Sequence, residues 1–150
     1  MPMNKYPEWW DSTITLYNKY TDPLTNNVRY FRHVIDGCFW DNTQDINISD
    51  KAQISSNDVI CRIRKDDRYK KRMEWEQLPN DEMGSYFTLG KDDILILGAV
   101  DDVIDENASK HRANDLIAKY KNTLDCIRVK RFSDNTGAGR VTPHYYLTGE

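Results

Sequence analysis

The segment Ile94 to Leu97, four apolar residues in a row in an otherwise polar chain, is the feature that most constrains the fold. Turn-forming residues bracket it, with Gly90–Asp93 before it and Gly98 followed by Asp101–Asp102 after it. An apolar run this short and so bounded is more typical of a strand buried on both faces than of a helix. We therefore predict that it is the central strand of a β core and that most segments around it are further strands.

Composition limits the size of that core and the classes of function. The chain has 150 residues, with 24 Asp and Glu against 21 Lys and Arg and a formal charge of -3. This length suggests one domain, which can bury roughly 70% of the unfolded chain's surface. Hydrophobic residues make up only 39% of the chain and its mean hydropathy is -0.79, so we expect a small core. The slight acidic excess argues against a dedicated nucleic-acid binder, although not against local basic patches.

The three cysteines, Cys38, Cys61 and Cys126, each lie in an apolar run, and none is paired as CxxC. We expect buried, reduced thiols, as in a protein of a reducing cytoplasm. The histidines are scattered, so no metal-ligand spacing is present. No apolar run approaches the length of about 20 residues that a membrane span needs, and the N-terminal sequence has no apolar signal segment. These patterns predict a protein made in a cytoplasm, with no metal, no cofactor and no membrane contact.

Strands are expected along most of the chain, because β-branched and aromatic residues are frequent and several segments alternate in polarity. The first two strands are expected to form a hairpin, with Gly37 as a bulge or a point of close approach in the second. A helix is predicted over His111–Asn122, where apolar residues recur at helical spacing, with Ser109 or Asn114 as its cap. The predicted strands, apart from Ile94–Leu97, cover residues 13–20, 28–40, 58–64, 123–132 and 141–148.

The predicted fold is therefore mainly β, a small antiparallel β-barrel or sandwich with long loops and one short α-helix insertion near residues 111–122. Residues 1–12 are expected to form an N-terminal arm, and residues 13–150 a single domain. Residues 41–57 are polar and are predicted to be an extended loop with room for a short strand. Residues 74–79 are expected to be a loop or short turn, and residues 81–87 a short helical turn leading into the central strand.

A basic segment follows the third predicted strand, with seven Lys and Arg among residues 62–72. Two interpretations remain open: a solvated charged loop, or a patch that faces DNA or an acidic partner. The candidate residues of such a DNA-facing patch are Arg64, Lys65, Arg68, Lys70, Lys71 and Arg72.

Large aromatic residues supply the candidates for contact with other proteins. Trp9 and Trp10 are adjacent in the predicted arm, where they either anchor a partner or cover the edge of the chain's own core. The full set of candidate interface residues is Trp9, Trp10, Tyr17, Trp40, Trp75 and Tyr145.

The sequence contains no arrangement that predicts catalysis. Gly137–Arg140 resembles a phosphate-binding loop in composition, but it lies between two strands and does not open a helix, so we expect a hairpin turn. The acidic pairs beside the central strand are explained by turn chemistry, and His111 and His144 have no nucleophile at a recognisable spacing. We therefore expect a non-enzymatic β domain whose work is contact with other proteins.

The order of these segments resembles that of small minor structural proteins of tailed phages and prophages of Gram-positive bacteria, often called minor capsid proteins. The resemblance runs from Trp9 to Gly149. It is carried by an opening strand and hairpin, a loop, a "Gly-x-Asp-x-Ile-x-x-x-Gly" strand and a closing hairpin, a layout similar to head-closure proteins, or stoppers. The segments concerned are Thr13–Lys19, Tyr30–Trp40, Val59–Ile63, Phe87–Gly98, Asp134–Arg140 and Pro143–Gly149.

The resemblance implies a β-barrel subunit of a homo-oligomeric ring, twelve-fold or six-fold, at the head–tail junction of a virion assembled in the bacterial cytoplasm. The ring would join the portal and adaptor to the tail or its completion protein and retain the genomic DNA in its channel. A long loop, Asp41–Asn57 or Lys65–Pro79, would reach into that channel, and the Trp9–Trp10 arm and edge strands would join the subunits. The alternatives are a tail completion, terminator or capsid-associated protein and, more remotely, a ligand-binding β domain.

Overall fold

The computed structural model describes residues 6–42, 45–49, 52–56, 58–137 and 142–150, with the backbone alone for 45–49 and 52–56. The described chain forms strands and three short helices. The strands are β1 (Ser12–Thr21), β2 (Val28–Asp41), β3 (Asp45–Ser49), β4 (Ala52–Ser56), β5 (Val59–Arg64), β6 (Ile94–Leu97), β7 (Cys126–Asp134) and β8 (His144–Gly149). The helices are α1 (Arg72–Glu76), α2 (Asn80–Met83) and α3 (Ala113–Tyr120).

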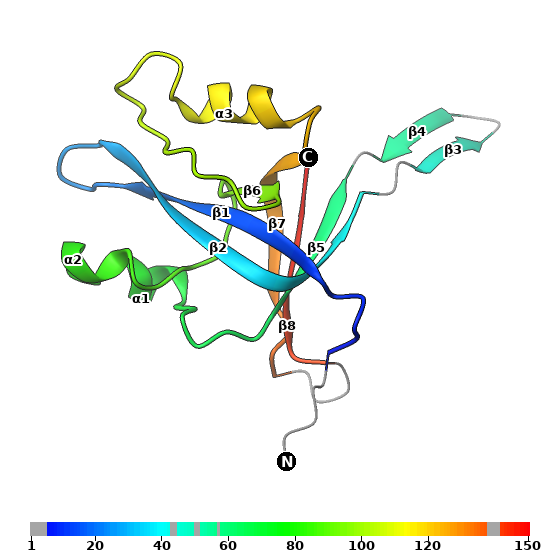
Figure 1. The fold of residues 1–150 in the computed structure, drawn as a ribbon, viewed down its shortest axis with the longest axis horizontal. Coiled ribbons are helices and arrows are strands. Elements are labelled where there is room, and N and C mark those ends of the chain that lie inside the picture. The colour runs from blue at the N-terminus through cyan, green and yellow to red at the C-terminus, as the bar shows by residue number, and fades with distance from the viewer. Residues whose placement is uncertain (1–5, 43–44, 50–51, 57, 138–141) are drawn as a thin grey trace.

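Six strands join edge to edge in the order β1-β2-β5-β8-β7-β6, and β6 pairs again with β1, so that the sheet closes into a ring (Figure 1). Every neighbouring pair in the ring is antiparallel. The prediction of a mainly β antiparallel fold is therefore confirmed. Closure gives each of these six strands a hydrogen-bonded neighbour on both sides, which reduces the free edges that an open sheet exposes, although β2 pairs with β5 only over Phe39–Asp41.

The segment Ile94–Leu97 forms β6 and is buried on both faces, as predicted. Leu95 points into the ring with Ile14 and Leu16, whereas Ile94 and Ile96 belong to a second apolar cluster outside it. Two separate cores therefore explain why the run shows no polar alternation. A closed ring has no central strand, so the predicted central position is wrong. β6 is a short strand that pairs with β1 on one side and β7 on the other.

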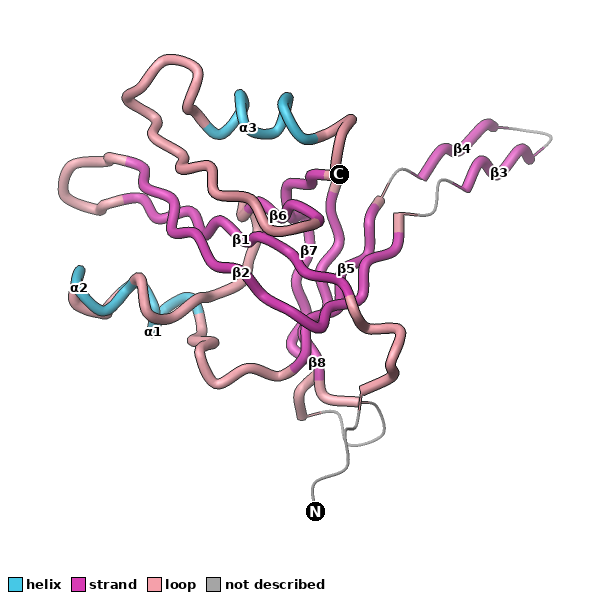
Figure 2. The backbone as a smooth tube through the Cα atoms, viewed as in Figure 1, coloured by secondary structure: helices cyan, strands magenta, loops and turns pink. Residues whose placement is uncertain are grey.

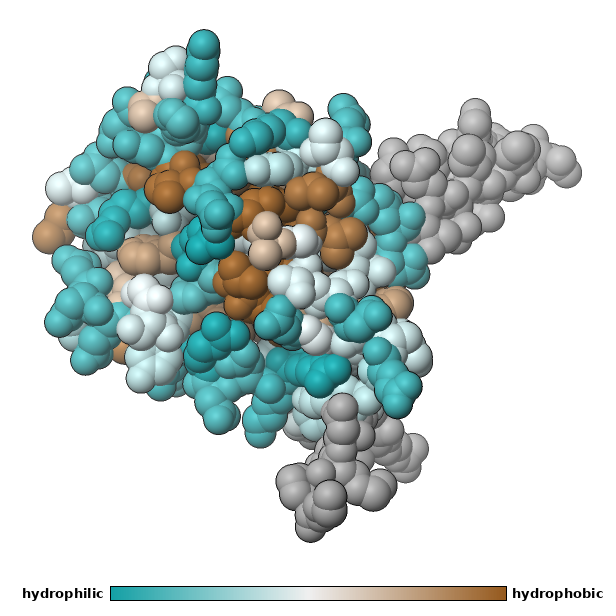
Figure 3. Space-filling view, viewed as in Figure 1, coloured by the Kyte–Doolittle hydropathy of each residue, from teal (hydrophilic) through white to brown (hydrophobic). Residues whose placement is uncertain are grey.

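The second core lies between the outer face of β1, β6 and β7 and a cover made by residues 98–112 and α3. Helix α3 falls within the predicted segment, and Ala113 and Leu116 are its buried residues. The predicted caps are wrong: the Glu106 carboxylate accepts the Ala113 amide at 3.0 Å, and the Asp115 carboxylate accepts the Arg112 amide at 3.2 Å. Figure 3 shows hydrophobic residues gathered near the middle of one face of the molecule, surrounded by hydrophilic ones.

Two predicted loops contain regular structure. Within residues 41–57, β3 and β4 pair as a hairpin, which projects away from the ring (Figure 2). The alternation of Ile46, Ile48 and Ile54 with polar residues is the pattern typical of strands. The rest of that segment, residues 43–44, 50–51 and 57, lies outside the described residues. Between β5 and β6, α2 overlaps the helical turn predicted over residues 81–87, and α1 extends into the segment predicted to be a loop or short turn.

The predicted hairpin of β1 and β2 is present, and its bulge falls at Gly37. Pairing passes from Ser12–Cys38 to Ile14–Ile35, and Gly37 has a φ of +70°, a conformation that glycine adopts without strain. Residues 6–11 of the predicted arm pack on the ring, since the Tyr6 hydroxyl donates to the Pro143 carbonyl at 2.7 Å. Of the predicted turn Gly137–Arg140, residues 138–140 lie outside the described residues.

Replacing Gly149 with Ala is expected to destabilise the ring, because the new methyl group would collide with the Arg128 carbonyl on the neighbouring strand β7. Such overpacking typically costs about 1–3 kcal/mol of unfolding free energy. Gly84→Ala is the matched control, because nothing lies within 4 Å of the added methyl group. Denaturant unfolding of both variants checks the prediction, which equal stabilities would contradict.

Candidate functional site

A row of side chains crosses the outer face of three neighbouring strands. Phe39 on β2 lies opposite Arg62 on β5, which lies opposite Tyr146 on β8. The guanidinium carbon of Arg62 is 5.1 Å from the Phe39 ring centroid and 5.4 Å from that of Tyr146, so that both rings make cation–π contacts with it. These three residues, together with Trp9 and Trp10, are called the Arg62 face below.

The two tryptophans extend this row at the start of the chain. Trp9 is 60% exposed, and its ring meets the Phe39 ring edge-on at 5.2 Å. The Trp10 ring stacks on Phe39 with the ring centroids 6.3 Å apart, and Trp10 is 5% exposed. Among the described residues, its buried indole N–H has no hydrogen-bond partner. The sequence left open whether the pair anchors a partner or covers the core; Trp10 covers the core, and Trp9 is available to a partner.

A shallow pocket adjoins the Arg62 face between β5, β7 and β8. Its donors include the Arg62 guanidinium and the Asn135 amide, and no described carboxylate pairs with Arg62. A guanidinium held between aromatic rings and free of a carboxylate partner is suited to binding a carboxylate or another planar anion. The residues that line the pocket are Trp10, Arg62, Ser133, Asn135, Thr142, His144 and Tyr146.

Three of the six candidate DNA-facing residues are used within the chain itself. Arg64 donates to the carbonyls of Gly37 at 2.8 Å and Trp10 at 3.0 Å. Arg68 pairs with Asp66 at 2.8 Å, and Arg72 pairs with Asp93 at 2.7 Å. Arg64 and Arg72 are therefore structural, which corrects their prediction as DNA-facing residues, whereas Arg68 is exposed and pairs with its near neighbour Asp66.

The lysines of the same segment differ from the arginines. Lys65 and Lys71 are exposed. The Lys70 ammonium lies 4.8 Å from the Tyr86 ring centroid, over its face. Lys65 and Lys71 therefore present positive charge to solvent. Arg62 also belongs to this segment but is not among the six candidates.

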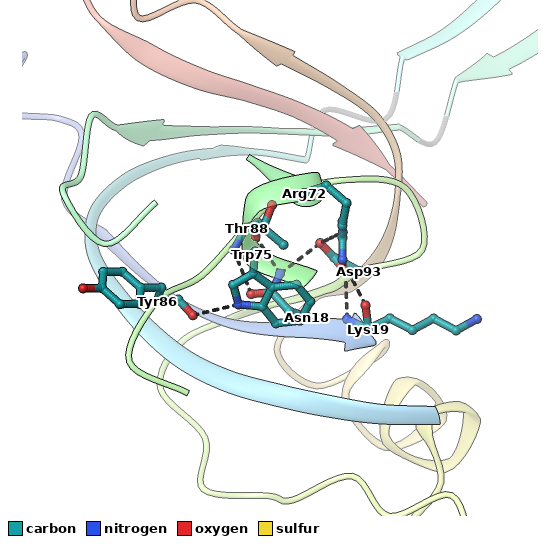
Figure 4. A network of polar contacts seen from close by, with 7 residues as sticks. All are labelled: Asn18, Lys19, Arg72, Trp75, Tyr86, Thr88 and Asp93. Carbon is teal, nitrogen blue, oxygen red and sulfur yellow. Dashed lines mark hydrogen bonds and ion pairs between the residues drawn. The ribbon is translucent and has the colours of Figure 1, made fainter. Parts of the chain in front are cut away.

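A buried polar network fixes the segment between β5 and β6 to β1 (Figure 4). The carboxylate of Asp93, which is fully buried, accepts hydrogen bonds from the Lys19 amide at 2.9 Å, the Asn18 side chain at 3.0 Å and Arg72 at 2.7 Å. Asn18 also donates to the Thr88 carbonyl at 2.6 Å and accepts the Thr88 amide at 3.1 Å. Burial raises the pKa of Asp93 to about 6, although Arg72 and the hydrogen bonds act against that rise.

Trp75, drawn beside this network in Figure 4, is wholly buried. Its prediction as an interface residue is therefore wrong. Its indole N–H donates to the carbonyls of Met83 and Tyr86, each at 3.2 Å. Its ring meets those of Tyr20 and Phe31 edge-on, at centroid distances of 5.9 Å and 5.4 Å. Trp75 thus anchors α1 and α2 to the hairpin of β1 and β2.

Three further interface candidates are also engaged inside the chain. Tyr17 is fully buried and donates its hydroxyl to the Asp102 carbonyl at 2.6 Å. Tyr145 is 3% exposed and packs against Tyr69 at 4.4 Å. Trp40 is half-buried, and its indole N–H donates to the Asp125 carboxylate at 3.1 Å. Large aromatic residues were taken as surface anchors, but in this fold they fill the core and brace its covering loops.

Sequence reasoning missed Phe39, Arg62 and Tyr146 as a group, because they come from three segments that only strand register brings together. A partial signal existed, since Arg62 alternates along its strand with Cys61 and Ile63, which are buried. The three cysteines are buried and free, as predicted.

The fold and site define a mainly β domain with a closed six-stranded ring and an arginine–aromatic surface. A family model, described as a family of unknown function (DUF6751), matches residues 9–150, so the chain belongs to this family. No curated protein and no solved structure matches it. Among the described residues, no helix is long and apolar enough to cross a membrane, and no cluster of His, Cys, Asp and Glu is suited to hold a metal.

The neighbours Trp9 and Trp10 should respond differently to replacement with Ala. Trp10→Ala removes a buried ring and is expected to lower the unfolding free energy by about 3–5 kcal/mol. Trp9 is 60% exposed, so Trp9→Ala should change stability by less than about 1 kcal/mol. Thermal and denaturant unfolding measure both, and a large loss for Trp9→Ala would show that Trp9 supports the fold.

Asp93 should make stability depend on pH in an unusual direction. Its pKa is about 6 in the folded chain, above the unfolded value of 3.8, so the folded state binds the proton more tightly. Lowering the pH from 7 to 5 should therefore stabilise the wild type relative to Asp93→Asn by about 1 kcal/mol. His33, whose pKa burial lowers to about 4, acts in the opposite direction but equally in both proteins.

Denaturant unfolding of the two proteins at pH 7 and pH 5 measures this difference. An unchanged stability gap between them at the two pH values would contradict the raised pKa.

Proposed function

We propose that this chain is a structural subunit of a tailed-phage neck, a head–tail connector of the head-closure type. The observation that carries the proposal is the β3–β4 hairpin, which projects from a closed β ring at the connection between β2 and β5 (Figure 1). The segment resemblance to head-closure proteins supports the same assignment. The ring of strands would be the rigid body of the subunit, and the hairpin the element that narrows a shared channel.

In this proposal, copies of the chain form a homo-oligomeric ring, twelve-fold or six-fold, in the virion. The portal and adaptor would bind on the head side, and the tail or its completion protein on the other. The β3–β4 hairpin lies on one flank of the ring of strands, away from α1, α2 and α3 (Figure 2). Such an element can enter a central channel while the packed body forms the wall.

Genomic DNA would occupy the channel, and the exposed lysines Lys65 and Lys71 are side chains of the basic segment that would contact its phosphates. Contacts of this kind are sequence-independent and weaken as salt rises. Arg64 and Arg72 would contribute through the fold, because they bind Asp93 and backbone carbonyls. A neck protein has to hold any packaged sequence, which fits backbone contacts better than base contacts.

Electron cryo-microscopy of particles from the encoding phage or prophage tests the assignment, by focused reconstruction of the portal vertex. The expected result is density for this chain as a ring between the adaptor and the tail. Density on the capsid shell or within the tail tube would overturn the connector assignment, and absence from the particle would overturn the structural role.

Replacing residues 43–57 with Gly-Gly should leave the ring of strands folded but release the genome from filled heads. Five residues would then join the paired positions Asp41 and Ile60, a length that ordinary hairpin loops use. The control variant carries a Gly/Ser segment of the original length, which keeps the reach of the chain without the paired strands. DNA retention is measured by nuclease protection, and full retention in the deletion variant would contradict a role for the hairpin in closure.

A further inference from the structure

We propose that copies of this chain bind one another head to tail, with the Arg62 face of one copy receiving the acidic loop of the next. The acidic loop is the segment of residues 101–106, which contains four carboxylates. This inference rests on the proposed ring assembly and names the surfaces that would build it. The occupant of the Arg62 face is thus a second copy of the same chain.

The two surfaces lie on different parts of the subunit. In the order β1-β2-β5-β8-β7-β6, strand β5, which carries Arg62, is opposite β6. The acidic loop is fixed over β1 and β2 next to β6, because the Tyr17 hydroxyl donates to the Asp102 carbonyl and Arg32 donates to the Val100 carbonyl at 2.6 Å. A head-to-tail contact in a closed cyclic ring joins two different patches of the subunit.

The acidic loop presents both charge and apolar surface. Asp101 is fully exposed, and its ion pair with Arg32 at 3.3 Å is at the surface. Asp102 is held by the Lys119 ammonium at 2.8 Å and by the Tyr120 hydroxyl, and these bonds fix the loop in place. Val103 is 71% exposed, and Asp105 beyond it is also exposed. The loop therefore offers a valine flanked by carboxylates on a backbone that is already held.

The Arg62 face offers the complementary groups. Its guanidinium has no carboxylate partner among the described residues, and the rings of Phe39 and Tyr146 orient it. Trp9 is 60% exposed and adds apolar surface beside them. A carboxylate satisfies the guanidinium in a bidentate pair, while the aromatic walls fit an aliphatic side chain such as Val103. Aromatic residues and arginine are also the residues that most often dominate binding energy at protein interfaces.

Closure of the ring favours a side-chain interface of this kind. Each of the strands β1, β2, β5, β6, β7 and β8 has neighbours on both sides for part of its length, which limits the predicted joining of subunits through edge strands of the ring. Outward-facing side chains and covering loops are then the larger surfaces on which ring bodies can meet. The Arg62 face and the acidic loop are such surfaces, and their charges are opposite.

Charge reversal on the full-length protein tests the contact. Self-association is measured by sedimentation velocity and native mass spectrometry over a concentration series at low salt. Arg62→Glu and the double variant D101K/D105K are each expected to weaken association at least about tenfold. Mixing the two variants should restore a dimer, because only one pairing in the mixture brings an intact acidic loop of one copy to an intact Arg62 face of the other.

Arg29→Glu is the matched control. Arg29 is also an exposed arginine on a strand, with its guanidinium carbon 4.9 Å from the Phe31 ring centroid, but it lies near the turn between β1 and β2. Its reversal is expected to leave association unchanged. Unfolding midpoints should show that every variant is folded under the conditions of the association measurement.

Several results would overturn the inference: a wild type that stays monomeric at every concentration, an Arg62→Glu variant that associates normally, or a mixture that does not form the dimer. If the mixed variants do not form the dimer, the acidic loop is not the partner of Arg62.

The proposed neck function is tested separately, by the position of the chain in the particle. If the chain lies at the portal vertex but its self-association does not depend on Arg62, only this contact is overturned.

Discussion

The carboxylate of Asp93 is the point on which the closed ring depends. Asp93 directly precedes β6, its carboxylate binds the backbone of β1 and the guanidinium of Arg72, and its carbonyl accepts the Val129 amide of β7. One residue therefore joins both neighbours of the shortest strand in the ring to the helical segment. With four residues, β6 can make few ladder bonds of its own, so directional side-chain bonds complete the closure.

Burying this charge is unfavourable in itself, and the surroundings of Asp93 offset the penalty with several donors instead of one. Such a network specifies geometry more strongly than apolar packing, because each bond has a direction and a length. It also explains why the basic segment is arginine-rich where it meets the ring. Arg64 and Arg72 each reach backbone carbonyls with a planar group that lysine lacks, and the lysines remain at the surface.

Local patterns in the sequence predicted most strands and α3, because burial imposes a period on the chain. The run Ile94–Leu97 was correctly predicted as a strand buried on both faces. Contacts between distant segments could not be predicted: Arg72 and Asp93 are 21 residues apart, and the Arg62 row depends on the register of three strands. Large aromatic residues were misassigned for a related reason. The sequence around Trp75 or Tyr145 does not show whether the ring contacts a partner or fills the chain's own core.

The β3–β4 hairpin differs from every other part of the sheet, because in the described chain its two strands pair only with each other. Their outer edges keep unpaired amides and carbonyls, which readily accept a strand from another molecule. In concentrated solution, this hairpin is therefore where intermolecular β-sheet and insoluble aggregates would begin. Where the six strands of the ring pair on both sides, their backbone groups are already used and do not offer such an edge.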